Sequence, residues 1–282
     1  MFRIVQRTPE QKADLEASWS RPDEELFASG ACHVLAAAFL EARADLGCQA
    51  VLIQPAPGFR GRHVVIANAH AIQDAVSRSV GKLIGGFKAM APPHGEPTRG
   101  VIYGGTILPS PCDLPARLVP QCGVEGEVAF IFRKDLRSRE TPYTREEVAA
   151  SVDACAVIEV VHSRYATDAK VTNLEKLADS ISNGALVYDA PKIDWHHLEL
   201  GRLKVTLSVN GETILQQDGG HPTGDPLGIA VLLVNLWREH GGVRAGQFIT
   251  CGSFTGLKFL KPGDVCRATF DRLGSAQVTF TF

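Results

Sequence analysis

Alternating apolar and polar residues in the second half of the chain predict mainly β-structure. The stretch LKVTLSVNGETIL at 203–215 alternates as far as Val209 and then reaches Asn210 and Gly211. Asn-Gly is the favoured pair for a two-residue hairpin turn. The pattern therefore predicts two antiparallel strands joined at residues 210 and 211.

Helical signals interrupt these strands at two places. Thr144 and Glu147 in YTREEVAA have the spacing of a capping box. Asp225 and Pro226 form a second helix start, followed by a helically spaced apolar stripe that runs to Trp237. We expect one helix after each start, within a domain made mainly of strands.

The first part of the chain has a mixed pattern. Residues 31–46 are alanine-rich and end at Gly47, which predicts a helix with a glycine stop. Residues 49–54 and 62–68 are β-branched and predict two strands, whereas apolar residues from 71 to 85 recur at helical spacing. Together these elements predict a small mixed α/β region.

A turn-rich stretch separates the two parts. The sequence APPHGEPTRG at 91–100 contains three prolines and two glycines, residues that favour turns and loops. We therefore divide the chain into a small mixed α/β N-terminal region, 1–95, and a β-rich domain, 96–282. The expected fold class is α+β.

Composition narrows the classes of partner. Of 282 residues, 45% are hydrophobic and 21% are charged, and 29 Lys and Arg are balanced by 31 Asp and Glu. No basic stretch is interleaved with aromatic residues, which argues against a nucleic-acid partner. The longest apolar run, 228–237, is about half of the roughly 20 residues that span a bilayer, so no membrane span is expected.

The N-terminal residues and the cysteines indicate a compartment. The segment MFRIVQRTPEQKADLE lacks the uninterrupted apolar core of a signal peptide. Seven cysteines are scattered singly, without a CxxC pair. This pattern suits reduced thiols and argues against a zinc knuckle or a disulfide framework. We expect a cytoplasmic protein.

Two glutamates interrupt an otherwise apolar strand. In GVEGEVAFIF, residues 123–132, Glu125 and Glu127 are two positions apart, so a strand places both on one face with their bases roughly 6.5–7 Å apart. That face continues into Ala129 and Ile131. Anions at the edge of an apolar face are costly unless a cation compensates them.

A third acidic residue has similar surroundings. Glu159 is flanked by apolar residues in CAVIEVVHSRY. Three carboxylates on core strands suit a hard divalent cation such as Mg²⁺ or Mn²⁺. The residues alone leave two other interpretations open, namely an exposed strand face and ion pairs of the glutamates with Arg133 or Lys134.

These segments resemble a known family. GVEGEVAFIFRKDL, VIEVVHSRY and KLADSISNGALV are similar, in this order, to segments of the 2-keto-4-pentenoate hydratase branch of the fumarylacetoacetate hydrolase superfamily. AIQDAVSRSVGKLIGGFKAM resembles that family's helix and lysine-bearing segment, and AGQFITCGSFTG resembles part of its C-terminal strands. The resemblance covers residues 70–282 and implies a mixed β-roll core, so that the domain at 96–282 would be the catalytic one.

The resemblance implies a metal site with a lysine beside it. Mg²⁺ or Mn²⁺ would be held by Glu125, Glu127 and Glu159, and would bind the 1-carboxylate and 2-oxo oxygens of a pyruvate-like substrate. Lys88 matches the family's active-site lysine, and near a cation its pKa should fall, making it a usable proton donor or acceptor. From the sequence alone, a solvated lysine at a helix end is the alternative.

The same resemblance adds polar candidates around the metal. Asp179 and Ser182 are candidate catalytic residues, because ADSISNG corresponds to the family's D-N-A-S-S-G stretch. Asn183, Thr250 and Ser253 are candidates for binding substrate. As bare patterns, the first stretch is equally consistent with a polar turn, and a threonine in a strand is ordinary.

One residue departs from the family pattern. The family usually has aspartate three residues after the third ligand, where this chain has His162. His162 is a candidate general base that titrates near neutrality, and a packed polar histidine is the alternative. Arg164 matches the family's arginine and would hold a ligand carboxylate in place or pair with substrate.

The activity that the resemblance implies is that of a hydro-lyase. It would hydrate a 2-hydroxy-2,4-dienoate to a 4-hydroxy-2-oxo acid during the degradation of aromatic compounds. The alternatives are a 2-oxo-dioate decarboxylase using the same site, a C–C hydrolase of the acylpyruvate type, and a catalytically silent homologue that keeps the fold. The expected partner is a small anionic 2-oxo acid, and the family commonly forms homo-oligomers.

Overall fold

The computed structural model describes residues 62–91, 97–165, 171–192 and 194–282. The chain divides into two units, residues 1–81 and residues 82–282. This division falls before the boundary at 95/96 that the turn-rich stretch suggested, because strand β1 (Ile84–Met90) pairs with strands of the second unit.

The first unit contains one helix in its described part, α4 (Arg62–Val80). The strand expected at 62–68 was therefore wrong, since these residues form the first two turns of α4. The β-branched residues Val64, Val65 and Ile66 favour a strand only weakly, and such local preferences are readily overridden. Gly81, with a φ of 64°, follows the helix as a glycine stop.

The other expectations for the N-terminal part have different outcomes. The helix expected at 71–85 is present as the second part of α4, but it ends at Val80. The chain has turned into strand β1 by Ile84. The expected helix at 31–46 and strand at 49–54 lie outside the described residues.

The first sheet of the second unit is mixed, with β5 and β6 at its centre. In the described part of the chain it has eight strands. In spatial order they are β2 (Thr98–Tyr103), β1 (Ile84–Met90), β10 (Phe248–Ser253), β5 (Gly123–Phe132), β6 (Val152–Val161), β7 (Asn183–Tyr188) and β3 (Ile107–Pro109), while β11 (Lys258–Phe259) pairs with β5. β1 is parallel to β10 and β3 is parallel to β7, whereas the other neighbours are antiparallel.

The second sheet contains the predicted hairpin. Its strands, in spatial order, are β4 (Cys112–Pro115), β13 (Gly274–Thr281), β12 (Val265–Phe270), β8 (Lys204–Val209) and β9 (Glu212–Asp218). β8 and β9 are joined by Asn210 and Gly211, whose φ angles of 53° and 85° are those that this kind of turn requires. The hairpin and the mixed α+β roll are confirmed.

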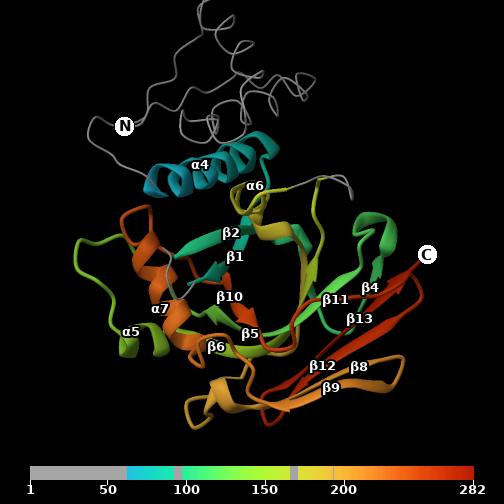
Figure 1. The fold of residues 1–282 in the computed structure, drawn as a ribbon. Coiled ribbons are helices and arrows are strands. Elements are labelled where there is room, and N and C mark those ends of the chain that lie inside the picture. Colours follow the sequence, from blue (N-terminus) through green and yellow to red (C-terminus); the bar gives the residue numbers. More distant parts are fainter. Residues whose placement is uncertain (1–61, 92–96, 166–170, 193) are drawn as a thin grey trace, which may run out of the picture. The chain divides into compact units, whose positions relative to one another are not determined.

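Alternation along β5 and β6 determines what fills the core between the two sheets. β12 and β13 pack against β6, as Figure 1 shows. Val128 and Phe130 of β5 and Ile158 of β6 are fully buried in one cluster with Phe270 of the second sheet. Side chains at the alternate positions of β5 and β6, including the three glutamates, therefore face away from the second sheet.

The first sheet curls, so that this other face is concave (Figure 1). β2 and β7 are not hydrogen-bonded neighbours, yet they lie against each other. The concave face holds a second apolar cluster, made of Ile102, Ala129, Cys155, Val157, Leu186 and Phe248. Ala129 follows Glu127 along β5 and Val157 precedes Glu159 along β6, each by one step of the alternation, so the glutamates border a packed apolar interior.

Short helices connect the strands. They are α5 (Arg145–Ala149), α6 (Asn173–Ala178) and α7 (Pro226–Trp237), with 3-10 turns η2 (Gly104–Thr106), η3 (Ala116–Leu118), η4 (Ser180–Ser182) and η5 (Leu200–Arg202). The predicted capping box at Thr144 and Glu147 is confirmed, and the Asp225 side chain caps α7 by accepting from the Gly228 N–H. No helix in the described part combines the length and apolarity needed to cross a bilayer.

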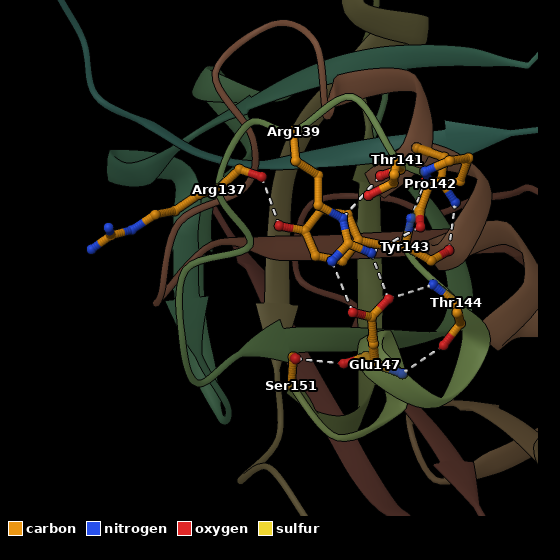
Figure 2. Close-up of polar contacts among 9 residues, drawn as sticks. Arg137, Arg139, Thr141, Pro142, Tyr143, Thr144, Glu147 and Ser151 are labelled. Carbon is orange, nitrogen blue, oxygen red and sulfur yellow. Dashed lines mark hydrogen bonds and ion pairs between the residues drawn. The ribbon is translucent and has the colours of Figure 1, made fainter.

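Glu147 also anchors the loop that precedes α5. Figure 2 shows Arg139 lying over the Tyr143 ring, with its guanidinium carbon 3.5 Å from the ring centre, and bonding both oxygens of Glu147 at 2.8 and 2.6 Å. The bond from Arg139 and the Thr144 N–H lower the pKa of Glu147 to about 2. The loop is therefore tied to the helix start through one carboxylate.

Replacing Glu147 should make stability less dependent on pH in the acid range. A carboxyl group whose pKa falls on folding stabilises the protein above its unfolded pKa, and this contribution is lost as pH falls through the folded pKa. Thermal melts should show Glu147→Gln less stable than wild type at pH 7, with the gap closing between about 4.5 and about 2. Glu140→Gln, at an exposed position of the same loop, is the control, and an equal gap at all pH values would contradict the assignment.

Candidate active site

The three glutamates converge at one end of the concave face. Glu125 and Glu127 lie on β5, and Glu159 lies on β6 directly opposite Glu125 in the ladder. One carboxylate oxygen of each lies within 4.8 Å of those of the other two. Glu127 and Glu159 are 1% and 0% exposed, so this is no exposed strand face. Arg133 pairs with Asp153 at 3.0 Å, away from the glutamates.

Lys88 reaches this cluster from β1. Its Nζ lies 2.9 Å from Glu159 Oε1 and 3.9 Å from Glu125 Oε2, and it donates a hydrogen bond of 3.2 Å to the Ile181 carbonyl. Burial lowers the pKa of Lys88, but the charges of Glu159, Glu125 and Glu127 together outweigh burial and raise it. The lowering expected beside a bound cation stays a prediction, because the shift described here comes from burial and the carboxylates alone. Lys88 is no solvated lysine, since it is 7% exposed.

The carboxylates carry more negative charge than Lys88 compensates. Burial raises the pKa of Glu127 well above its ordinary value, and the charges of Glu159 and Glu125 add to this effect. The pKa of Glu125 is also raised, chiefly by burial. At an effective dielectric constant of about 20, two unit charges within 4.8 Å repel by roughly 3 kcal/mol or more. A further cation would remove this repulsion.

The donor set fits a hard divalent cation. Every candidate ligand atom is a carboxylate oxygen, as Mg²⁺ and Mn²⁺ prefer. Glu159 Oε2 is buried and has no hydrogen-bond partner among the described residues, although its other oxygen is bonded. An unsatisfied buried carboxylate oxygen is costly, and a metal ion at this position would satisfy it.

Two further groups orient the buried glutamates. The Asn183 side chain donates from Nδ2 to Glu159 Oε1 at 3.0 Å. The Gly252 N–H donates to Glu127 Oε2 at 3.1 Å, from an irregular step in the ladder between Thr250 and Ser253. Such bonds fix the direction in which ligand oxygens point. Asn183, expected to bind substrate, thus bonds directly to a candidate metal ligand.

Arg164 and Asp179 bind each other instead of facing the glutamates. The Arg164 guanidinium bonds the Asp179 carboxylate and main-chain carbonyl, and it donates from Nη1 to the Asn183 carbonyl at 2.6 Å. The Ser163 hydroxyl donates a hydrogen bond of 3.2 Å to the other carboxylate oxygen of Asp179. These contacts support the segment that carries Asn183, so Arg164 reaches the site indirectly.

His162 directly follows β6 and is half-buried. The main-chain N–H of His162 donates a hydrogen bond to the Ser182 carbonyl at 2.8 Å. Within the described part of the chain its side chain makes no hydrogen bond or ion pair with the glutamates or Lys88, and Nδ1 has no partner. Burial, followed by the charge of Arg164, lowers the pKa of His162, while Asp179 opposes this shift.

The remaining candidates are hydroxyl residues. Thr250 lies next to Lys88 in the β1–β10 ladder, and Ser253 lies opposite Glu127. The Thr250 hydroxyl is buried and has no hydrogen-bond partner in the described part of the chain, whereas the buried Ser253 hydroxyl is close enough to Glu125 to oppose the rise in that carboxyl's pKa by hydrogen bonding. Both could therefore accept or donate a bond to a bound ligand. The Ser182 backbone, rather than its hydroxyl, makes the contact with His162.

One element of the site was not anticipated from the sequence. Ser180, Ile181 and Ser182 all have positive φ, at 52°, 55° and 57°, and the Ile181 carbonyl accepts the bond from Lys88. Left-handed turns normally signal themselves by glycine or asparagine. This one contains neither, so no local signal could have revealed it.

Comparisons with known proteins place this chain in a family. Residues 94–281 match the family model of the fumarylacetoacetate (FAA) hydrolase C-terminal domain. The chain is 29% identical over 187 residues to a 2-keto-4-pentenoate hydratase of Paraburkholderia xenovorans strain LB400, covering 66% of this chain and 68% of the relative. It is 29% identical over 162 residues to a 4-oxalocrotonate decarboxylase of a Pseudomonas species, covering 56% and 60%.

A solved structure has the same fold. The 4-oxalocrotonate decarboxylase of Pseudomonas putida G7, complexed with magnesium and adipate, superposes with a TM-score of 0.66 at 23% identity, covering 76% of this chain and 86% of that one. The chain therefore belongs to the fumarylacetoacetate hydrolase family, as the extent of the family match shows.

Changing one glutamate should weaken metal binding without unfolding the protein. Glu127→Gln replaces a charged oxygen ligand by an amide and relieves carboxylate repulsion. We expect Mn²⁺ affinity, measured by calorimetry, to fall at least about 10-fold. Loss of a group that only supports a metal ligand typically costs about 10–100-fold, and Glu127 is itself a candidate ligand. Asp153→Asn, on the same face of β6 but paired with Arg133, is the control. Unchanged Mn²⁺ binding in Glu127→Gln would refute the assignment.

Proposed function

We propose that this protein is a metal-dependent hydro-lyase that adds water to a 2-hydroxy-2,4-dienoate, in its 2-keto-4-enoate form, to give a 4-hydroxy-2-oxo acid. The observation that carries the proposal is the buried cluster of Glu125, Glu127 and Glu159 with Lys88 bonded to it. Family membership and the similarity to a 2-keto-4-pentenoate hydratase support the same conclusion.

The proposed cofactor is Mg²⁺ or Mn²⁺, held by the three glutamates. When bound, the ion would supply Lewis-acid stabilisation of negative charge on the carboxylate and 2-oxo oxygens of the substrate. Asn183 and the Gly252 N–H keep Glu159 and Glu127 oriented toward one point. The glutamates give the site an excess of negative charge, which a bound cation would offset. The site would then suit a small anionic substrate.

The residues beside the glutamates would move protons and orient the substrate. Lys88 is the proposed proton carrier, acting through Nζ, which lies 2.9 Å from Glu159 Oε1 and 3.9 Å from Glu125 Oε2. The buried hydroxyls of Thr250 and Ser253 would bond substrate oxygens, because Thr250 lies opposite Lys88 and Ser253 lies opposite Glu127 in their ladders. Asp179 and Arg164 would act through the segment that they support.

A decarboxylase acting on a 2-oxo-dioate is the second candidate. The similarity to a 4-oxalocrotonate decarboxylase has the same percentage identity as the similarity to the hydratase, although over a shorter stretch. Both reactions would develop negative charge on the same 2-oxo acid, so the same cluster can serve either. We further propose that the protein is cytoplasmic, homo-oligomeric and part of the degradation of aromatic compounds.

A substrate panel with three readouts tests the proposal. The purified protein with Mn²⁺ or Mg²⁺ is given 2-hydroxypenta-2,4-dienoate, 4-oxalocrotonate and an acylpyruvate. A hydratase removes the dienol absorbance of the first without releasing CO₂ or pyruvate. Release of CO₂ from the second identifies a decarboxylase, and pyruvate from the third identifies a hydrolase. No turnover with a bound metal ion identifies a catalytically silent homologue.

Removing Lys88 should abolish most of the activity but preserve the metal site. We expect Lys88→Ala to lower kcat by roughly 10²–10⁴-fold, the usual range for a general acid or base. Mn²⁺ affinity should stay within about threefold, because the ligands remain in place. Lys134→Ala, at an exposed position just after β5, is the control. Full activity in Lys88→Ala would exclude it as the proton carrier.

His162 provides a test of the position where this chain leaves the family pattern. If it carries a proton, kcat should show a His162-dependent limb below the ordinary value of about 6.5, because burial and Arg164 lower its pKa. His162→Asp should then keep activity and move the limb to lower pH. Profiles of kcat against pH and thermal melts of both proteins are the measurements. An unchanged profile with a lower Tm would assign His162 to packing.

A further inference from the structure

The η4 turn adopts an unfavourable backbone conformation beside the glutamates. Ser180, Ile181 and Ser182 are all left-handed, at φ values of 52°, 55° and 57°. This conformation is sterically unfavourable for residues with a Cβ, and especially for a β-branched residue such as Ile181. Strained backbone persists only where its surroundings enforce it, and it is concentrated at functional sites.

The turn presents two polar groups to the same carboxylate oxygen and its lysine. The Ile181 carbonyl accepts from Lys88 Nζ at 3.2 Å, and the Asn183 side chain donates to Glu159 Oε1 at 3.0 Å. Lys88 Nζ lies 2.9 Å from that same Oε1. Both contacts therefore direct Lys88 to one oxygen of Glu159 and leave Oε2 without a partner among the described residues.

A glycine on β2 allows the turn to approach this closely. Gly100 lies opposite Lys88 in the β1–β2 ladder. A Cβ at Gly100 would lie 2.4 Å from the Ser180 carbonyl oxygen and 2.7 Å from its carbon. These are main-chain atoms that cannot rotate away, so any larger residue must push the turn outward. Gly100 is thus needed for space, in contrast to glycines that supply a positive φ.

The opposite side of the turn is also held by hydrogen bonds. The His162 N–H donates to the Ser182 carbonyl at 2.8 Å, and Arg164 donates to the Asn183 carbonyl at 2.6 Å. The turn is therefore confined between β2 and the segment that follows β6. The acceptors are main-chain carbonyls, so both bonds restrain the main chain of residues 182 and 183 directly.

We infer that η4 is the positioning element for Lys88, and that Gly100 is the positioning residue that sets the distance between η4 and β1. The inference rests on the proposed function only in taking Lys88 as the proton carrier. The metal ligands belong to β5 and β6, so displacement of η4 should misplace the lysine more than the glutamates. Misplacement of a reacting group by about 1 Å can cost 10²-fold in rate.

Gly100→Ala tests this inference, with Gly105→Ala as a matched control, because a Cβ at Gly105 would meet nothing within 4 Å. We expect kcat of Gly100→Ala to fall at least about 10-fold, with KM and the Mn²⁺ affinity from calorimetry within about threefold of wild type. Gly105→Ala should match wild type. A parallel loss of kcat and Mn²⁺ affinity would show general damage to the site and overturn the inference.

A readout without turnover separates this inference from the proposed function. Lys88 is 7% exposed, so an amine-acylating reagent followed by mass spectrometry should label it slowly in wild type and Gly105→Ala. Gly100→Ala should be labelled at least about 10-fold faster at the same folded fraction. This result in a protein without activity on the panel would support the positioning role and reject the function. Protection equal to wild type would overturn the positioning role.

A second variant covers the case in which Gly100→Ala does not fold. Ile181→Pro forces φ toward about −65°, which is incompatible with the left-handed turn, and it leaves β2 unchanged. It should expose Lys88 to the reagent and lower kcat in the same way, while Mn²⁺ affinity is retained. Slow labelling of Lys88 in a folded Ile181→Pro protein would equally contradict the inference.

Discussion

The burial of three carboxylates around one ammonium is the constraint on which this structure depends. Charged groups lose their hydration when buried, and like charges within 4.8 Å repel. Lys88 compensates part of this charge, Asn183 and the Gly252 N–H satisfy two oxygens, and Glu159 Oε2 is left for a cation. The polar groups nearest the cluster are arranged so that an ion can complete it.

The curled sheet allows these charges to be buried because its two faces have different surroundings. Every second residue of β5 and β6 packs against the other sheet, where apolar side chains form the main core. The remaining positions form the concave face, where an apolar cluster fills the interior and the glutamates lie at its border. The carboxylates and Lys88 all come from strands, namely β5, β6 and β1, and the η4 turn adds a carbonyl that accepts a bond from the Lys88 ammonium. Under our proposal, the position of η4 sets where that ammonium lies.

The same arrangement explains why the family contains enzymes with different names. A hydratase and a decarboxylase both bind a 2-oxo acid and stabilise the negative charge that develops on it. The same three glutamates can serve both reactions. Differences must come from the groups that carry protons and define the substrate's position. In this chain the proposed groups of this kind are Lys88, Thr250 and Ser253, and His162 is the position proposed to differ from the family pattern. Arg164 and Asp179 contribute by supporting the main chain instead.

Local patterns in the sequence determined the hairpin at 210 and 211, the capping box at Thr144 and the common face of Glu125 and Glu127, because turn chemistry and strand alternation act over a few residues. The apolar residues around Glu159 marked it as a third candidate carboxylate, and the resemblance to the family supplied Lys88. Only the tertiary structure decided that Glu159 pairs opposite Glu125, that carboxylates raise the pKa of Lys88, and that 62–68 is helical. It alone revealed the left-handed turn. These features depend on strand register and on contacts between residues distant in the chain, which no local preference encodes.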